Sequence, residues 1–382
     1  MRVLHTSDWH LGRSFHREDL LGSLGVFADH LLEVVRSEHV DVVVVSGDIY
    51  DRALPAIDAV ALGSEIFERL AASRARVVAI SGNHDSARRL GAHSGLIDAA
   101  GVHFRTVADQ CDRPVLLGDE HGEVAFYAIP YLEPETVREL WGLPARSHQA
   151  ALDHAMARIR ADLAPRGARS VVLAHAFAAG ATPSDSERDI SVGGVNRVGL
   201  QTFSGVDYAA LGHLHGAQTL SDSVRYSGSP IAYSFSEATH CKGSWLVDLG
   251  PGGLSSCEFI EAPVPRALSR LRGTLTDLLT DPAYDDLADH WIEATLTDET
   301  RPKGAHDRLT ARFPHLLVSR FAHAQPRQRL TRSTAAPGLS PTQMTLEFFH
   351  TVRGEACAPD DVDVISTVVE SCCREADQVV VG

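Results

Sequence analysis

Short apolar runs recur through the first 250 residues, and each one ends in a turn that carries Asp, Asn or His. The runs cover residues 2–6, 41–45, 77–80, 171–174 and 208–211. Continuous apolar runs of this length are typical of strands buried on both faces of a sheet. Between them the apolar residues follow helical spacing, as at Leu24, Phe27, Leu31, Leu32 and Val35, and again at Ile57, Val60, Ile66, Phe67 and Leu70. This alternation predicts an α/β fold.

The polar residues stand at the same end of every predicted strand. They are Asp8 and His10, Asp48, Asn83 with His84 and Asp85, His175, and His213 with His215. Ligands of α/β sheets gather at the carboxyl ends of the strands. We therefore expect these side chains to meet in one pocket.

Together these residues offer the ligands of a two-metal site. Two cations about 3.5–4 Å apart can activate a water nucleophile and neutralise charge on a phosphate. A mixture of carboxylate, amide and imidazole ligands suits manganese, iron or zinc better than magnesium alone. Each motif taken singly has a simpler explanation: Asp8 or Asp48 as a helix cap or turn residue, and His175 as a buried, hydrogen-bonded histidine. Their joint occurrence in order favours the metal site.

The order Asp-x-His, Gly-Asp, Gly-Asn-His-Asp, a lone His and Gly-His-x-His resembles the calcineurin-like metallophosphoesterase superfamily. The segments 5–12, 184–194 and 226–237 are similar to the nuclease subunits of that superfamily that act with an ABC-type ATPase. The resemblance covers most of residues 1–248 and is loose beyond about residue 262. It implies an α/β sandwich of two mixed sheets flanked by helices, with a small α/β cap domain and C-terminal helices.

The resemblance also implies a role for each site residue. Asp8, His10 and His215 would hold one divalent ion, Asn83, His175 and His213 the other, and Asp48 would bridge the two, with Mn²⁺ as the expected metal. His84 would act on the scissile phosphate as general acid or transition-state stabiliser, oriented by Asp85. Asp51 stands where some relatives carry a catalytic histidine, so its role stays open.

The chain divides into three predicted parts. Residues 1–262 form the nuclease domain, residues 263–336 a small α/β cap domain that binds DNA, and residues 337–382 C-terminal helices. The cap is expected to hold strands at 291–296 and 316–321 and a helix at 305–313. Ser340-Pro341-Thr342-Gln343 predicts a capped helix start and Gly354 its end, and a second helix follows Pro359.

The formal net charge of -15 argues against tight DNA binding by this chain alone. The resemblance supplies a partner, an ABC-type ATPase with long coiled coils, on which the C-terminal helices would dock. Residues 54–100 resemble dimer helices, so we expect a homodimer within a heterotetramer. Arg88, Arg89 and the arginines at 327, 329 and 332 are candidate phosphate contacts, although solvated surface charge explains them nearly as well.

The predicted function is a metal-dependent DNA exonuclease and single-strand or hairpin endonuclease for DNA end processing, repair, recombination and replication. Six cysteines without CxxC spacing and no apolar run long enough to cross a bilayer predict a cytoplasmic protein with no membrane contact. The resemblance to DNA nucleases implies that it is nucleoid-associated. One alternative is a phosphatase or cyclic-nucleotide phosphodiesterase of the same superfamily, and residues 47–52 resemble a phosphatase turn. Another is a non-catalytic scaffold, but the complete ligand set argues against it.

Overall fold

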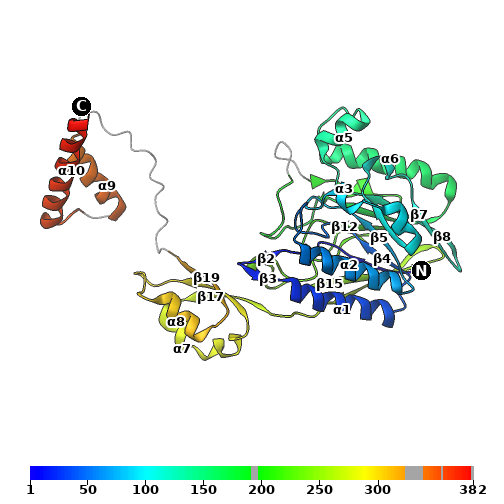
Figure 1. Ribbon diagram of the computed structural model, residues 1–382, viewed down its shortest axis with the longest axis horizontal. Helices are drawn as coiled ribbons and strands as arrows, with labels where there is room; N and C mark the ends of the chain where they lie inside the picture. Colours follow the sequence, from blue (N-terminus) through cyan, green and yellow to red (C-terminus); the bar gives the residue numbers. More distant parts are fainter. Residues whose placement is uncertain (191–196, 323–338, 354–355, 380–382) are drawn as a thin grey trace. The chain divides into compact units, whose positions relative to one another are not determined.

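The structure is a computed structural model, and it describes residues 1–190, 197–322, 339–353 and 356–379. The chain forms two compact units, Met1–Ala322 and His323–Gly382. Each unit is described by itself (Figure 1).

The first sheet carries the strands predicted from the N-terminal apolar runs. Its order is β16-β15-β1-β4-β5-β6. The strands β1 (Arg2–Thr6), β4 (Val42–Val45), β5 (Arg76–Ile80) and β6 (Val102–Arg105) run parallel, and β15 (Gly243–Gly250) and β16 (Gly253–Glu261) extend the sheet in antiparallel fashion. The helices α1 (Leu21–Ser37) and α2 (Ile57–Ala72) pack on its outer face through Leu24, Phe27, Leu31, Ile66 and Leu70. Both predicted helices are thereby confirmed.

The second sheet has the order β13-β14-β12-β9-β8-β7. It is formed by β7 (Val115–Asp119), β8 (Gly122–Ile129), β9 (Arg169–His175), β12 (Tyr208–Gly212), β13 (Gln218–Thr219) and β14 (Val224–Tyr226). The helices α5 (Pro134–Trp141) and α6 (His148–Arg166) lie against its outer face (Figure 1).

The two sheets pack face to face over a third apolar core. Valines of β1, β4 and β5 meet Phe126, Leu173 and Tyr208 of the second sheet there. The strands β4, β9 and β12 are buried along their whole length, as expected for strands covered on both faces. The predicted sandwich of two mixed sheets flanked by helices is confirmed.

A small α/β module follows the sandwich and belongs to the same compact unit. Its parallel strands are β17 (Leu268–Gly273), β18 (Trp291–Leu296) and β19 (Leu316–Phe321). The helices α7 (Leu275–Thr280) and α8 (Ala305–Arg312) enclose a separate core with them. The strands and helix predicted in this region are confirmed, whereas the boundaries of the three predicted parts stay a prediction.

The second unit contains α9 (Pro341–Arg353) and α10 (Pro359–Val379). The predicted capping box is confirmed, because the Gln343 amide N donates to Ser340 Oγ at 3.2 Å and the Ser340 amide N donates to Gln343 Oε1 at 2.9 Å. The arginines at 327, 329 and 332 and Gly354 lie outside the described residues. Within the described parts of the chain, no helix is long and apolar enough to cross a membrane.

Candidate metal centre

The loops that follow the parallel strands of the two sheets meet at one edge of the sandwich. The amide N of Asp8 donates to the Gly47 carbonyl at 3.0 Å, and that of His10 donates to the Asp48 carbonyl at 2.9 Å. In the second sheet Gly212 pairs with His175, so β9 and β12 end at neighbouring positions of the same sheet edge. All seven predicted metal ligands lie at this edge, as the strand-end pattern indicated.

Four of these residues have a backbone conformation that side-chain-bearing residues rarely adopt. Asp8, His10, Asp48 and His213 have positive φ values of 54°, 47°, 51° and 106°. A non-glycine residue in this region costs on the order of 1–3 kcal/mol, and such strain is concentrated at functional sites. The backbone conformation that directs these side chains into the pocket therefore lowers the stability of the fold.

One group of ligands joins the two sheets. Candidate ligand atoms of Asp8, His10 and His215 all lie within 4.8 Å of one another. His10 Nε2 faces His215 Nε2 at 3.1 Å, and the backbone N–H of His213 donates to both carboxylate oxygens of Asp8 at 3.0 and 3.1 Å. These are the three residues that the resemblance assigned to one ion.

The second group surrounds the carboxamide of Asn83. Its Oδ1 lies 2.9 Å from His175 Nε2 and 3.2 Å from His213 Nδ1. Asp48 stands between the two groups, with Oδ2 3.4 Å from His175 Nε2 and 3.6 Å from His10 Nε2. Asp48 is therefore within reach of both groups of candidate ligands.

The charge of this pocket fits divalent cations. Burial lowers the pKa of His10 to about 3 and that of His215 to about 4, so both rings are neutral and can offer a lone pair. Burial, opposed by His175 and reinforced by Asp48, raises the pKa of Asp8 to about 8. Burial opposes a charge on His175, but the nearby Asp48 outweighs it and raises the pKa of His175 to about 9, so protons on Asp8 and His175 offset the Asp48 charge when no ion is bound. Bound cations would take the place of these protons.

His84 lies at the rim of the pocket and is partly exposed. Its backbone N–H donates to Asp48 Oδ1 at 2.8 Å, and its ring packs edge-on against His10 with centroids 4.6 Å apart. Its Nδ1 donates to the Asp51 carbonyl at 2.7 Å, because a carbonyl can only accept. The Nε2 atom is thus the one left for a substrate.

Asp85, which we expected to orient His84, has its carboxylate among backbone N–H groups. The Asp85 carboxylate accepts the backbone N–H groups of Ile49, Tyr50 and Gly82 at 3.1, 2.9 and 2.9 Å. Asp85 therefore ties the loop after β5 to the loop after β4, and Asp51 orients the His84 ring through its backbone. The Asp51 carboxylate also approaches His10 Nδ1, at 3.6 Å.

Sequence reasoning missed the side chains that support His215. Ser186 Oγ lies 2.5 Å from His215 Nδ1, and Glu187 Oε1 accepts the backbone N–H of His215 at 2.8 Å. Behind Ser186 lie the buried Glu237 and Lys242. Ser186, Glu187 and Glu237 belong to segments 184–194 and 226–237, so the available signal was the resemblance of those segments; residues 191–196 lie outside the described part.

Residues 1–217 match the family model of calcineurin-like phosphoesterases. The chain belongs to this family, whose members use divalent metals. Residues 264–352 match a second model, described as the type 5 capsule protein repressor C-terminal domain. Within the family the chain is of the SbcD type. The resemblance to nuclease subunits that the sequence indicated is thereby confirmed.

The curated relatives include the SbcD subunit of the SbcCD nuclease of Staphylococcus epidermidis. It is 27% identical over 321 residues, which cover 83% of this chain and 84% of the relative. The match therefore extends from the sandwich into the module that follows it.

Solved structures with a similar fold include TT1561 of Thermus thermophilus, with 13% identity and a TM-score of 0.39 over 68% of this chain and 98% of that one. YfkN of Bacillus subtilis has 14% identity and a TM-score of 0.36 over 68% and 90%. These matches concern the fold alone.

Proposed function

We propose that this chain is a two-metal-dependent DNA nuclease, a double-strand exonuclease and single-strand or hairpin endonuclease in DNA end processing, repair and recombination. One observation carries the proposal: seven potential ligands from five strand ends lie in one pocket, with the buried carboxylate of Asp48 between the other six. The SbcD subunit of the S. epidermidis SbcCD nuclease, which matches most of the chain, supports DNA as substrate.

Asp8, His10 and His215 would hold the first ion, and Asn83, His175 and His213 the second, with Asp48 shared between them. When bound, two divalent cations supply an activated water at neutral pH and neutralise charge on the phosphoryl oxygens. We propose Mn²⁺, because imidazole, amide and carboxylate donors together suit it.

His84 would act on the substrate rather than on the ions. Since Nδ1 carries the hydrogen donated to Asp51, a neutral ring presents a lone pair at Nε2 and a protonated ring presents an N–H. The protonated ring can donate to a phosphate oxygen or to the departing oxygen. Asp85 contributes indirectly, by holding the loops that carry Asp48 and His84.

We propose that an SbcC-type ABC ATPase with coiled coils is the partner and that α9 and α10 dock on it. Met344, Phe348 and Val352 recur every four residues along α9, and Val364 and Val368 do so on α10; all five are 42–63% exposed. Apolar side chains at this spacing on exposed helices fit a groove of a partner protein. A partner also resolves the difficulty that the net charge of -15 opposes DNA binding.

We propose further that the chain forms a homodimer within a heterotetramer. In support, α2 and the turn before it carry the exposed apolar side chains Leu54, Ile57 and Val60, which are 65%, 86% and 42% exposed and would be covered in a dimer. The cap module would contact DNA, and the complex would act in the cytoplasm at the nucleoid.

A phosphatase or cyclic-nucleotide phosphodiesterase is the second candidate, because the same ligand set serves those reactions. The rates on duplex DNA, a phosphopeptide and a cyclic nucleotide, measured with Mn²⁺, separate the two. Preferential cleavage of DNA is the expected result. A non-catalytic scaffold would bind metal or partner and cleave none of the three.

The direct test is DNA cleavage with Mn²⁺ by the chain copurified with its ATPase, with and without ATP, next to the Asp48→Asn variant. Asparagine keeps the acceptor for the His84 backbone N–H but removes the shared charge. We expect cleavage to fall by at least about 100-fold, as for loss of a group that stabilises charge in the transition state. His154→Ala, at a histidine whose ring packs at a tilt against Trp141 in the outer helices, is the control. Equal activity of Asp48→Asn and the wild type would refute the assignment.

A further inference from the structure

A buried ion pair lies directly behind the loop that carries His215. Lys242 Nζ is 2.5 Å from Glu237 Oε2, and the two side chains are only 5% and 0% exposed. Lys242 Nζ also donates to the His215 carbonyl at 2.7 Å and to Ser229 Oγ at 2.9 Å. All three hydrogens of the ammonium group therefore have an acceptor, and two of these acceptors belong to Glu237 and His215.

The other carboxylate oxygen of Glu237 reaches the imidazole of His215 through a serine. Ser186 Oγ donates to Glu237 Oε1, which as a carboxylate oxygen can only accept. The Ser186 oxygen then accepts from His215 Nδ1, 2.5 Å away. This chain of two hydrogen bonds fixes the hydrogen of His215 on Nδ1 and leaves the lone pair on Nε2, which faces the pocket.

We propose that Glu237 is a positioning residue that sets the tautomer and the orientation of His215, and that Lys242 keeps Glu237 in its charged, accepting form. The inference rests on the proposed function, because it concerns the ion held by Asp8, His10 and His215. A carboxylate behind a metal-binding histidine raises the basicity of the ring and fixes its direction. Here Ser186 links the carboxylate of Glu237 to the ring of His215, and Lys242 forms an ion pair with that carboxylate.

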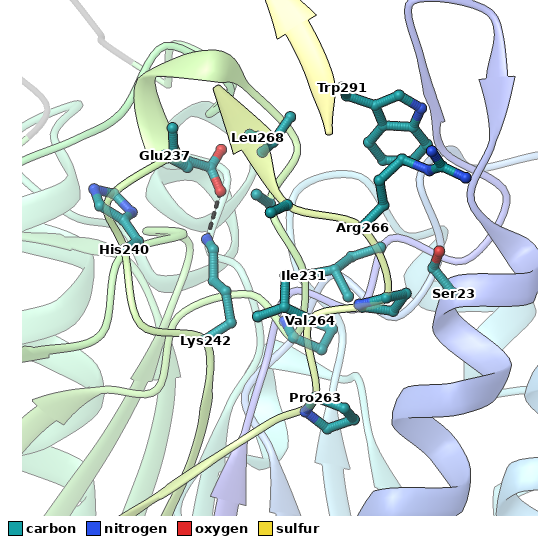
Figure 2. Close-up of a pocket in the computed structure, with 15 residues that line it drawn as sticks. Ser23, Ile231, Glu237, His240, Lys242, Pro263, Val264, Arg266, Leu268 and Trp291 are labelled. Atoms are coloured by element: carbon teal, nitrogen blue, oxygen red, sulfur yellow. Dashed lines mark hydrogen bonds and ion pairs between the residues drawn. The ribbon is translucent and has the colours of Figure 1, made fainter. Parts of the chain in front are cut away.

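The pair borders a cavity, which leaves room for replacement side chains of similar length. Glu237 and Lys242 line a cavity of about 200 Å³ between the sandwich and the small module (Figure 2). Leu268, Arg266 and Trp291 line it from the side of the module. A side chain that borders a cavity can be replaced by one of similar length without overpacking, so Lys242→Met and Glu237→Gln are expected to fold.

The test is a titration of the metal-free full-length chain with Mn²⁺, followed by calorimetry and by electron paramagnetic resonance. The wild type is expected to bind two ions, whose spins couple at a separation of about 3.5–4 Å. Three variants are expected to lower the affinity for the first ion about 10- to 100-fold and to leave the affinity for the second unchanged: Glu237→Gln, Lys242→Met and Ser186→Ala. At one equivalent of Mn²⁺ the three variants should give the same uncoupled resonance spectrum as His215→Ala, which loses the first ion. Their spectra should differ from that of His213→Ala, which loses the second ion.

The control is Asp119→Asn, which disrupts another ion pair with little exposure, that between Asp119 and Arg169, away from the metal ligands. It is expected to lower the melting temperature and leave both ions bound as in the wild type. Two ions bound with wild-type affinity in Glu237→Gln, or equal weakening of both ions, would overturn the positioning role while the proposed function stands. A wild-type chain that binds no Mn²⁺ would instead overturn the proposed function.

Discussion

At the scale of the residue, His175 and His84 both hold Nδ1 against a backbone carbonyl and differ in what their Nε2 atoms face. His175 Nδ1 donates to the Ser46 carbonyl at 2.9 Å and points Nε2 at Asp48 and Asn83. His84 donates to a carbonyl as well, but its free nitrogen lies at the rim. The first arrangement suits a metal ligand and the second suits contact with substrate.

This difference predicts separate effects of two substitutions. His84→Gln is expected to lower kcat about 100- to 10,000-fold, the range of general acid–base catalysis, and to leave the affinity for both Mn²⁺ ions unchanged. His175→Ala is expected to weaken metal binding itself. Single-turnover cleavage measured beside Mn²⁺ calorimetry distinguishes the two effects. Weaker metal binding in His84→Gln would contradict the role given to this residue.

The seven ligands could be predicted because each follows a buried strand, and the ends of neighbouring parallel strands meet. The role of Asp85 could not, because adjacency to His84 in the chain does not determine where a carboxylate points in a tight loop. Glu237 was missed for another reason: it acts through Ser186, 51 positions away, and nothing in the local sequence links them.

At the scale of the element, the loop after β5 must approach the loop after β4 very closely. A Cβ atom at Gly82 would lie 2.1 Å from Asp48 Oδ1 and 2.5 Å from Asp48 N. Glycine is required here because any side chain would displace the Asp48 carboxylate.

Gly82→Ala is therefore expected to abolish high-affinity Mn²⁺ binding and to lower the free energy of unfolding by about 1–3 kcal/mol through overpacking. Gly25→Ala is the matched control, since nothing lies within 4 Å of the added methyl group and the position is inside α1. It should raise the unfolding free energy by about 0.5–1 kcal/mol. Calorimetry and urea unfolding of both variants measure these effects, and tight metal binding by Gly82→Ala would contradict the geometry.

Asp119 joins the two sheets. It ends β7, receives Arg169 Nη2 at 2.5 Å and lies 2.8 Å from the N-terminal ammonium of the chain, next to β1. Arg169 and the ammonium group lower the pKa of Asp119 below its usual value. A carboxyl whose pKa is depressed in the folded state stabilises the fold above its unfolded pKa, near 3.9, and loses that contribution as the pH falls through the folded pKa.

Asp119→Asn is thus expected to cost about 1–3 kcal/mol at pH 7, since Arg169 loses its charged partner. The difference from the wild type should shrink below about pH 4, where protonation of Asp119 begins to remove the same interaction. Urea unfolding at several pH values gives the comparison. A cost that stayed constant from pH 7 to the acid range would exclude this account.

At the scale of the whole molecule, the candidate metal centre lies in one of the two compact units. The unit Met1–Ala322 holds the pocket and four apolar cores, and the unit His323–Gly382 holds α9 and α10. The sequence predicted the fold of the first unit because its strands and helices have regular periodicity. The placement of the ATPase cannot be read from one chain, because both surfaces of a contact determine it.

Phe348→Asp tests the docking surface on α9. The side chain is 52% exposed, so the substitution should change the unfolding free energy by no more than about 0.5 kcal/mol. We expect the affinity for the ATPase to fall at least about 10-fold, because burial of a charge opposite an apolar groove is unfavourable. His350→Asp, exposed and off the Met344–Phe348–Val352 stripe, is the control. Loss of the partner in both variants would point to a general charge effect instead.

The central claim is that seven side chains from two sheets bind a pair of ions. Crystals of the chain grown with Mn²⁺ and measured at the manganese absorption edge test it most directly. Two anomalous peaks about 3.5–4 Å apart are expected, with Asp48 contacting both, Asp8, His10 and His215 around one, and Asn83, His175 and His213 around the other. A map without peaks in this pocket, or with ions bound by other residues, would contradict the account.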